Sequence, residues 1–411
     1  MQEFSFPLGF LFGAATSSYQ IEGNNTSSDW WLWEQNYTGK PGGPTEKSGI
    51  ACDSYNRYEE DFELARLLGH NVHRLSLSWA RIEPANGEFN KEEIEHYRKV
   101  LKSIKSKGMK TFVTLWHFDV PIWFREIHGW ANVMAPKYFE RYAKVVAERL
   151  GEDIDFYVTM NEPQVYLVMR HILRYWNPIK SHGMLDFLQG LFGLKRAHRS
   201  AYLAIKKVDP SAQVGIVENV MSMEPKYKTL WNKFVVELRK TIQFRLIFQY
   251  TKADFFGINF YFHDVIGPRD LWVDRSSIET DGNVSDWGWQ IYPEGIYRVI
   301  KEVSRYKKPL YITENGLADA KDFKREEFIV GHLYWLQKAI AEGADVQGYM
   351  HWSLLDNFEW AEGYKWKFGL IEVDRENNLE RKIRPSAYTY TKIIRDNGLS
   401  KELLRKYKLI D

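Results

Sequence analysis

Eight short apolar runs, rich in residues that favour strands, recur along the whole chain with longer amphipathic stretches between them. Most runs are continuous rather than alternating, which is typical of strands buried on both faces. They cover 10–17, 71–79, 111–118, 156–161, 214–219, 255–261, 310–315 and 348–355. Helical patterns separate them at 55–68, 91–107, 136–150, 190–208, 293–306 and 325–342. This alternation predicts an α/β fold, a single (β/α)8 TIM barrel.

The domain organisation follows from the same pattern. A chain of 411 residues is long for one domain, but (β/α)8 barrels commonly exceed 250 residues. No Gly/Ser-rich or Pro-rich linker and no repeat interrupts the alternation. We therefore predict one barrel domain over residues 1–411.

Charge and cysteine content exclude several classes of partner. The 56 Lys and Arg nearly balance the 54 Asp and Glu, so no basic field favours nucleic acid. Cys52 is the single cysteine, so it cannot form an internal disulfide, and it lacks the neighbouring Cys and His ligands that a zinc site needs. No run reaches the ~18 apolar residues of a membrane span, and residues 1–18 lack the charged start of a signal peptide. We expect a cytoplasmic protein.

Aromatic residues make up 16% of the chain. Aromatic rings stack on the apolar faces of sugars, and Trp and Tyr can also hydrogen-bond hydroxyls. A large core rich in rings would give the same composition. The placement of the rings therefore has to decide between the two readings.

Polar side chains gather where the apolar runs stop. In a (β/α)8 barrel, the chemistry lies at the C-terminal ends of the strands, where the loops converge on one face. The polar and aromatic residues at or just beyond these ends include Gln20, Glu22, Arg74, His117, Asn161, Glu162, Asn219, Asn259, Tyr261, Glu314, Trp352 and Glu359. A carboxylate at the end of an apolar strand is costly to bury without a partner or a task.

Glu162 and Glu314 form the most informative pair. They follow the fourth and seventh strands, which a barrel places on opposite sides of one cleft. Either residue alone could be an ordinary surface glutamate. Cleavage of a glycosidic bond needs one protonated carboxyl and one ionised carboxylate across such a cleft. The pair therefore predicts a glycoside hydrolase that acts on a small-molecule substrate.

Four segments, in order along the chain, resemble glycoside hydrolase family 1, the β-glucosidase and β-galactosidase barrels. They are Phe10–Gly23, Thr159–Pro163, Ile312–Gly316 and Trp352–Trp360. The resemblance covers nearly the whole chain. It implies a retaining exo-β-glycosidase that releases terminal β-D-glucosyl residues from alkyl, aryl or oligosaccharide glycosides, with no metal or organic cofactor. Galactosyl and fucosyl substrates stay open.

The resemblance also implies roles for single residues. Glu162 would be the acid/base and Glu314 the nucleophile, with Arg74 and Tyr261 holding Glu314 ionised and Glu162 taking a raised pKa. Asn161 would bind the 2-hydroxyl of the sugar. The substrate-binding set is Gln20, His117, Asn161, Asn259, Trp352, Glu359, Trp360 and Phe368.

A related subgroup that cleaves 6-phosphosugars carries Ser, Lys and Tyr at three positions where this chain has Glu359, Trp366 and Phe368. A carboxylate and two apolar rings would not pair with a phosphate dianion. Unphosphorylated sugars are therefore expected.

Two segments, 224–254 and the loop from Tyr261 to Trp287, look shorter than the family pattern. This trimming predicts exposed side walls of the barrel and local looseness through 224–290. The shape of the leaving-group site is open for the same reason.

An apolar stretch made of two runs, 165–178 and 184–193, follows the predicted acid/base. It would border the mouth of the cleft and suit alkyl or aryl glycosides, a membrane surface or a second copy of the chain, or it would simply pack on the barrel. Arg170, His171 and Arg174 lie within it. If one of them reached Glu162, it would lower that pKa and move the activity optimum to acidic pH.

Two competing interpretations keep the barrel but change the chemistry: a catalytically silent sugar-binding barrel, and an engineered barrel that serves another reaction. Both would require a damaged carboxylate pair, and both glutamates are present. The preferred sugar, the balance of hydrolysis and transglycosylation, and the oligomeric state stay open.

Overall fold

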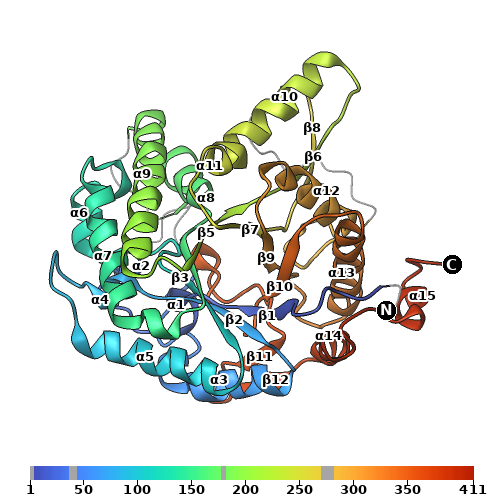
Figure 1. The fold of residues 1–411 in the computed structure, drawn as a ribbon, viewed down its shortest axis with the longest axis horizontal. Coiled ribbons are helices and arrows are strands. Elements are labelled where there is room, and N and C mark those ends of the chain that lie inside the picture. The colour runs from blue at the N-terminus through green and yellow to red at the C-terminus, as the bar shows by residue number, and fades with distance from the viewer. Residues whose placement is uncertain (1–3, 37–43, 177–181, 270–281) are drawn as a thin grey trace.

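Eight parallel strands close into a barrel in the computed structural model, which describes residues 4–36, 44–176, 182–269 and 282–411 (Figure 1). Neighbouring strands follow the order β1, β2, β3, β4, β5, β7, β9 and β10, and β10 pairs with β1. The predicted (β/α)8 barrel is confirmed. The strands are β1 Leu11–Ala15, β2 Val72–Ser76, β3 Lys110–Thr114, β4 Phe156–Asn161, β5 Gln213–Asn219, β7 Phe255–Asn259, β9 Leu310–Asn315 and β10 Val346–Trp352.

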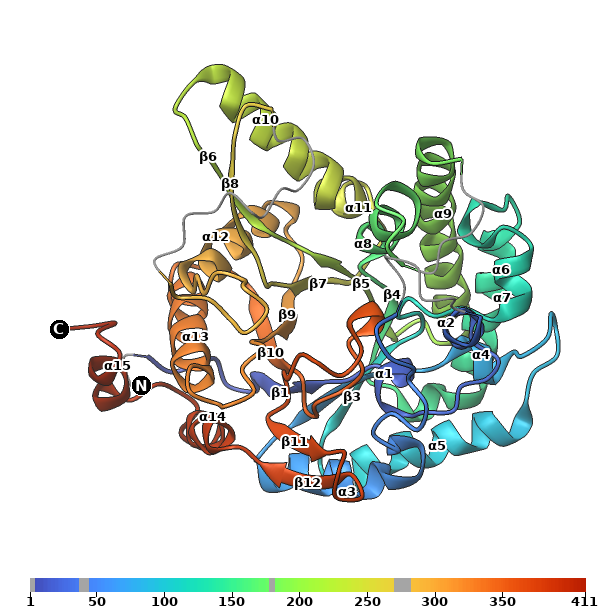
Figure 2. The same cartoon turned by 180° about the vertical axis from the view of Figure 1, so that it is seen from behind.

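Helices form the outer layer of the barrel, and the two opposite views show them around the strands (Figures 1 and 2). Those at the predicted helical patterns are α3 Ser54–Leu67, α5 Lys91–Ser106, α7 Ala135–Leu150, α9 Met184–Val208, α12 Glu294–Val303 and α13 Arg325–Ala341. The largest difference from the prediction is α9, which begins at Met184 rather than at Gly190. The residues added at its start, 184–189, are mostly apolar, so the sequence did not show the alternation of apolar and polar faces that marks an amphipathic helix.

Helix α5 shows why these segments are helical. The Asn90 side chain accepts hydrogen bonds from the backbone N–H groups of Glu92 and Glu93, which caps the first turn. Ile94, Leu101 and other apolar residues at helical spacing are buried against the barrel.

The barrel interior is filled at its base by one apolar side chain from each strand. These residues are Leu11, Val72, Phe112, Val158, Val217, Phe255, Tyr311 and Met350, and all are buried in one cluster. This packed layer closes the lower end of the barrel. The main cavity opens toward the C-terminal ends of the strands.

Several strands end earlier than the apolar runs predicted. Strand β2 stops at Ser76, and Ser78 then caps the short helix α4 Trp79–Ile82 by accepting from Arg81 N–H. Apolar residues continue past the strand because the loop that follows is also buried. The hydrophobic run therefore marks burial rather than strand geometry.

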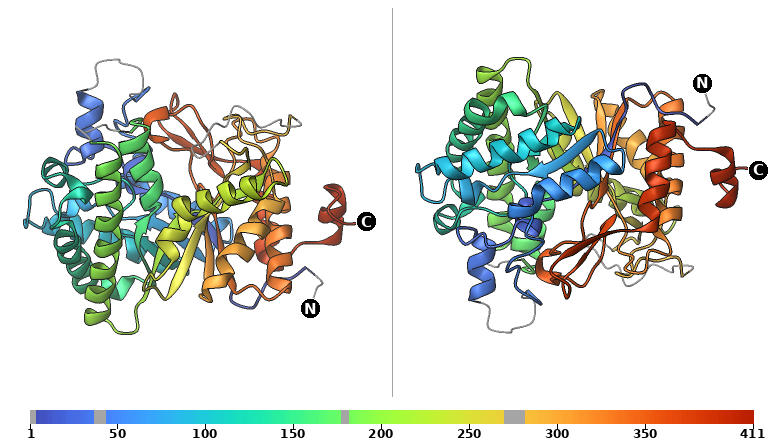
Figure 3. Two further views of the ribbon diagram at one scale, coloured as in Figure 1. Left: turned by 90° about the horizontal axis from the view of Figure 1, so that it is seen from above. Right: turned by 90° about the horizontal axis from the view of Figure 1, so that it is seen from below.

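The region that was interpreted as trimmed forms a projection from the side of the barrel rather than a bare wall (Figures 1 and 3). It contains β6 Ser222–Pro225, α10 Leu230–Lys240, a π-helical turn Thr241–Arg245, α11 Leu246–Phe248 and β8 His263–Ile266, with β6 and β8 paired in parallel. The Phe248 and Phe256 ring centroids lie 4.6 Å apart, and both rings are buried. The predicted exposure of the side wall is therefore wrong for Phe256, because α11 covers that strand.

The predicted looseness of 224–290 stays a prediction, and its part at 270–281 lies outside the described residues. A hairpin of β11 Ile371–Asp374 and β12 Glu380–Ile383 was not predicted. No helix among the described residues is long and apolar enough to cross a membrane. Cys52 is buried as a free thiol, and its Sγ donates to Asp356 O over 3.1 Å.

Candidate active site

A cavity of about 490 Å³ opens at the C-terminal end of the barrel. Of the twelve predicted site residues, all except Arg74 and Asn259 line it, and those two lie directly behind the lining. The lining includes Gln20, His117, Asn161, Glu162, Tyr261, Glu314, Trp352, Glu359, Trp360 and Phe368. Residues far apart in the sequence therefore meet in one place.

Strand register sets the polar residues at one level of the barrel. Asn219 on β5 lies opposite Asn259 on β7, and Asn259 lies opposite Glu314 on β9. Asn161 at the end of β4 pairs in register with Val217 on β5. Because parallel strands end together, these side chains reach the same cleft.

Glu314 is held by a cation and a phenol. Arg74 Nη1 donates to Glu314 Oε1 over 2.5 Å, and the Tyr261 hydroxyl donates to Glu314 Oε2 over 2.8 Å. Burial raises the pKa of the Glu314 carboxyl, while the Arg74 charge and these hydrogen bonds oppose that rise. Both oxygens therefore accept hydrogen bonds that favour the ionised form.

Glu162 has neutral hydrogen-bond partners instead. Asn259 Nδ2 donates to Glu162 Oε1 over 2.6 Å, and Asn219 Nδ2 lies 3.4 Å from the same oxygen. No ion pair reaches Glu162 among the residues that the structure describes. Burial and then the charge of Glu314 raise the pKa of the Glu162 carboxyl to about 8. At neutral pH this carboxyl therefore holds a proton that it can give away.

Asn161 is oriented by its neighbours. Its Oδ1 accepts from Arg74 Nη2 over 2.6 Å and from Asn259 Nδ2 over 3.1 Å. The Asn161 Nδ2 group is thereby turned toward His117 Nε2, 3.3 Å away, which accepts. Burial lowers the pKa of His117 well below its usual value, so its ring is neutral. Its Nδ1 is buried and has no hydrogen-bond partner among the residues that the structure describes.

Gln20 and Glu359 form a polar part of the cavity wall. Gln20 Nε2 donates to Asn357 Oδ1 and to Phe358 O, over 3.0 and 2.9 Å. Burial raises the pKa of Glu359 to about 8, against hydrogen bonds from Trp352 and Gln20. This wall combines hydrogen-bond donors and acceptors, as the hydroxyl groups of a sugar require.

Aromatic rings lie against this wall. The His117 and Trp352 ring centroids lie 6.0 Å apart at 18°, and Trp360 stacks on Tyr19 at 5.8 Å and 8°. On the next side of the cavity, Trp287 stacks on Trp366 with centroids 5.2 Å apart. The rings predicted from the sequence therefore include cavity walls as well as core.

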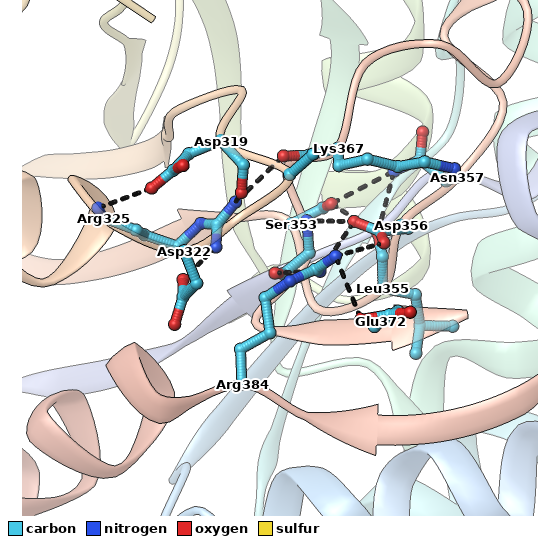
Figure 4. A network of polar contacts seen from close by, with 12 residues as sticks. Asp319, Asp322, Arg325, Ser353, Leu355, Asp356, Asn357, Lys367, Glu372 and Arg384 are labelled. Carbon is cyan, nitrogen blue, oxygen red and sulfur yellow. Dashed lines mark hydrogen bonds and ion pairs between the residues drawn. The ribbon is translucent and has the colours of Figure 1, made fainter. Parts of the chain in front are cut away.

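A buried ion network fixes the loop that carries Glu359 and the turn that carries Phe368 (Figure 4). Arg384 Nη1 and Nη2 donate to the two oxygens of Asp356, each over 2.9 Å. Gly369 N–H donates to Asp356 Oδ1 over 2.9 Å, and Arg325 Nη2 donates to Lys367 O over 2.9 Å. Asp356 and Lys367 are close neighbours of Glu359 and Phe368 in the chain, so the network holds both sides of the cavity wall.

The outer part of the cavity is apolar. Val165, Val168, Met169, Leu173 and Trp176 line it, as predicted for the stretch that follows Glu162. Other members of that stretch, Leu185, Leu188 and Phe192 on α9, are exposed on the surface of the molecule instead. The stretch therefore contributes both to the mouth and to an outer face.

Arg170 does not reach Glu162. Its Nη1 donates to Asp29 Oδ2 over 3.0 Å and to the Tyr166 hydroxyl, and both Arg170 and Asp29 are buried. For Arg170, the hypothesis of a lowered acid/base pKa is therefore wrong, because α2 Asp29–Gln35 supplies a closer carboxylate. Burial lowers the pKa of His171 to about 4, so that ring is neutral as well.

Sequence reasoning missed several residues of the cavity. Gln243 and Trp287 line it and belong to the two segments that were interpreted as trimmed, and Met221 and Trp289 line it from just outside those segments. Glu218 was also missed, although a carboxylate inside an apolar run was a visible signal. Among the described residues, no group of three or more His, Cys, Asp and Glu side chains is arranged to hold a metal ion.

Comparison with known proteins agrees with this geometry. The chain matches the model of glycosyl hydrolase family 1 over residues 2–250 and 240–399. Beta-glucosidase A of Thermotoga maritima is 32% identical, with 96% of this chain and 98% of that protein covered. A beta-galactosidase of Pyrococcus woesei is 29% identical, with 97% and 98% covered.

Solved structures give the same result. A beta-glycosidase from Pyrococcus horikoshii superposes with a TM-score of 0.91 at 35% identity, covering 99% of each chain. A beta-glucosidase from Thermotoga maritima, solved in complex with glucoimidazole, superposes with a TM-score of 0.89 at 30% identity. That alignment covers 96% of this chain and all of the other.

Proposed function

This chain belongs to glycosyl hydrolase family 1, and from that premise we propose that Glu162 and Glu314 carry out its reaction as acid/base and nucleophile. The protein is a retaining β-glycosidase. The observation that carries the assignment of roles is the contrast between the two carboxyls in one cavity. Glu314 accepts from a guanidinium and a phenol, whereas Glu162 accepts only from amides and has a pKa of about 8.

In the first step, a Glu314 oxygen attacks the anomeric carbon and the bond from that carbon to the leaving oxygen breaks. Glu162 gives its proton to the leaving oxygen, so the aglycone departs as a neutral alcohol. Arg74 and Tyr261 fix the attacking carboxylate. Asn161, which lines the cavity, binds the 2-hydroxyl as positive charge develops on the sugar ring.

In the second step, water attacks the anomeric carbon and the ester bond to Glu314 breaks. Glu162, now ionised, takes a proton from that water and returns to its starting form. The negative charge on Glu314 is absent in the ester, so the repulsion that raised the Glu162 pKa is relieved. One residue can therefore serve first as acid and then as base.

The sugar site suits a terminal β-D-glucosyl residue, and galactosyl substrates are the next candidates. Relatives named as beta-glucosidase and as beta-galactosidase both support this range. Gln20 and Glu359 provide polar contacts, Trp352 provides a stacking surface, and His117, Asn259, Trp360 and Phe368 complete the set. Glu359 and the rings of Trp366 and Phe368 favour an unphosphorylated sugar.

The apolar outer cavity supports alkyl and aryl glycosides as substrates. Val165, Val168 and Met169 follow Glu162 directly and would contact the leaving group. Apolar leaving groups gain affinity in such a wall because their surface is removed from water. Hydroxyl-rich leaving groups gain less.

For the molecule as a whole, we infer one catalytic domain over residues 1–411 that works without a cofactor. Cytoplasmic location, contact with a membrane surface and self-association remain predictions from the sequence. The interpretation as a silent sugar-binding barrel has no specific support, because the carboxylate pair is intact and hydrogen-bonded.

The decisive experiment follows the first product by proton NMR during cleavage of an aryl β-glucoside. We expect the β-anomer of the sugar to form first, because two displacements retain configuration. A 2-deoxy-2-fluoro glucosyl fluoride should label Glu314, and peptide mass spectrometry would locate the label. Initial formation of the α-anomer, or a label on another residue, would contradict the proposed roles.

A further inference from the structure

Glu218 is a carboxyl that the mechanism above does not use, yet it lies directly behind Glu162. It is the sixth residue of β5, between Val217, which packs in the barrel interior, and Asn219, which lines the cavity. Its side chain is fully buried. No cation pairs with it within the described part of the chain. Burial of a carboxyl without such a partner is costly, and this calls for an explanation.

Glu162 itself has an unusual backbone. It is the N-cap of the short helix α8 Pro163–Leu167, with φ of 45° and ψ of 54° in the left-handed region. For a residue other than glycine this conformation is strained, so surrounding contacts must hold it. Pro163 has no N–H group, and the first amide that α8 can offer is that of Gln164.

Three consecutive residues of β5 hold this turn. Val217 O accepts from Glu162 N–H over 2.9 Å, and Asn219 Nδ2 approaches Glu162 Oε1. Between them, Glu218 Oε2 accepts from Gln164 N–H over 3.3 Å, and Glu218 Oε1 accepts from Asn219 N–H over 2.9 Å. The Glu218 carboxyl therefore ties the start of α8 to β5, with Glu162 between the two attachment points.

The charged groups on neighbouring elements have other partners. Arg245 on the π-helical turn pairs with Glu237 and Glu302, and Arg239 on α10 pairs with Asp264. On α9, Lys195 donates to Leu246 O. Burial, and then the neighbouring Glu162 carboxyl, raise the pKa of the Glu218 carboxyl well above its usual value.

We propose that Glu218 is a positioning residue for the acid/base, which holds the Glu162 carboxyl at the leaving oxygen by anchoring the turn between β4 and α8. The inference rests on the proposed role of Glu162. Its consequence is specific, because proton donation depends on the position of Glu162, whereas attack by Glu314 does not.

The test compares kcat/KM for two aryl β-glucosides that differ in how much they need an acid. Phenyl β-glucoside has a poor leaving group and requires the proton, whereas 2,4-dinitrophenyl β-glucoside leaves without it. In Glu218→Gln, one carboxyl oxygen becomes an NH2 group that faces a backbone N–H, so one anchor is lost. We expect kcat/KM for the phenyl substrate to fall by about tenfold or more, and that for the dinitrophenyl substrate to change by less than about threefold.

A matched control is Glu83→Gln. Glu83 is equally buried and accepts from Gly87 N–H and Trp79 Nε1. It also pairs with Arg141, and none of these partners belongs to the turn that carries Glu162. Glu83→Gln should not change the ratio of kcat/KM between the phenyl and the dinitrophenyl substrate. If Glu218→Gln changes kcat/KM for both substrates by the same factor, or changes kcat/KM for neither, the proposal is overturned.

Folding and the proposed function are separated by two further variants. Glu218→Asp keeps the carboxyl but is too short to span both amides, so it should behave like Glu218→Gln. If neither variant folds, Glu218 has a purely structural role and the proposal fails. In Glu162→Ala, kcat/KM should fall selectively for phenyl β-glucoside. With the 2,4-dinitrophenyl substrate, azide should restore turnover by replacing water in the second step, and a glycosyl azide should form. If Glu162→Ala does not behave in this way, the assigned role of Glu162 itself fails.

Discussion

Arg74 Nη1 donates to Glu314 Oε1 over 2.5 Å, and both side chains are buried. Burial alone would favour a protonated Glu314, so this cation offsets part of the cost of the nucleophile's charge. In Arg74→Met, the pKa of Glu314 should rise further. Since Glu314 must be ionised to attack, the acidic limb of the kcat/KM profile should move to higher pH. We expect kcat/KM at neutral pH to fall by about 10²–10³. An acidic limb that stays in place would count against this role of Arg74.

The basic limb should depend on Glu162. Its pKa of about 8 means that the acid form is lost as the pH rises through that value. The rate of cleavage of a phenyl glucoside should therefore fall above about pH 8. Glu359 has a similar pKa, so a single profile cannot separate the two groups.

A substrate that leaves without a proton separates them. In the pH profile of kcat/KM for 2,4-dinitrophenyl β-glucoside, the fall at high pH that is due to Glu162 should vanish. Any fall that is due to Glu359 should stay. An identical basic limb with both substrates would mean that Glu162 does not act as the acid.

The barrel and the placement of the polar strand ends could be predicted because both follow from local pattern. Strands β4 and β9 match the predicted runs at 156–161 and 310–315 to the residue. Their ends coincide with a switch from apolar to polar residues. Where the following loop is buried as well, as after β2, the apolar run continues and the predicted strand is too long.

Side-chain partners could not be predicted in the same way. Arg170 is close to Glu162 in the sequence but pairs with Asp29, which is 141 positions away. Its choice of partner depends on how α2 packs against the helix that follows β4, and no local pattern encodes that. The projection that contains α10 was likewise interpreted as missing structure, since chain length alone does not show that Phe248 covers Phe256.

Glu359 should make the enzyme reject 6-phosphosugars. It is buried in the cavity, beside Trp352 and Gln20, and no Lys or Arg is among the described residues that line the cavity, so a phosphate dianion would meet a carboxyl there. We expect the wild type to hydrolyse a nitrophenyl β-glucoside faster than its 6-phosphate. Glu359→Gln should lower kcat/KM for the plain glucoside by about tenfold or more, because an NH2 group replaces one of the carboxyl oxygens that can accept hydrogen bonds. Faster cleavage of the phosphorylated substrate by the wild type would refute the assignment.

Arg170 should matter for stability rather than for the pH profile. In Arg170→Ala, buried Asp29 loses its cation, and we expect a loss of about 3–5 kcal/mol in the free energy of unfolding. Denaturant unfolding would measure it. The double variant Asp29→Asn with Arg170→Met removes both charges and should recover much of the loss. The pH limbs of activity should not move in Arg170→Ala; a shift of the basic limb would show that Arg170 acts on Glu162 after all.

The apolar outer cavity should make kcat/KM rise with the length of an alkyl leaving group. Each methylene group that leaves water contributes at most about 0.8 kcal/mol, so an octyl glucoside should exceed an ethyl glucoside by about tenfold or more. Met169 lines this wall, and Met169→Gln should flatten the dependence because it places an amide beside the chain. Leu188 is 44% exposed on α9 and does not line the cavity, so Leu188→Gln serves as the control and should keep the wild-type slope. If kcat/KM of the wild type does not rise with alkyl chain length, the leaving group does not run along this wall. If Met169→Gln and Leu188→Gln lower the dependence on chain length equally, the effect lies on the outer face of α9 instead.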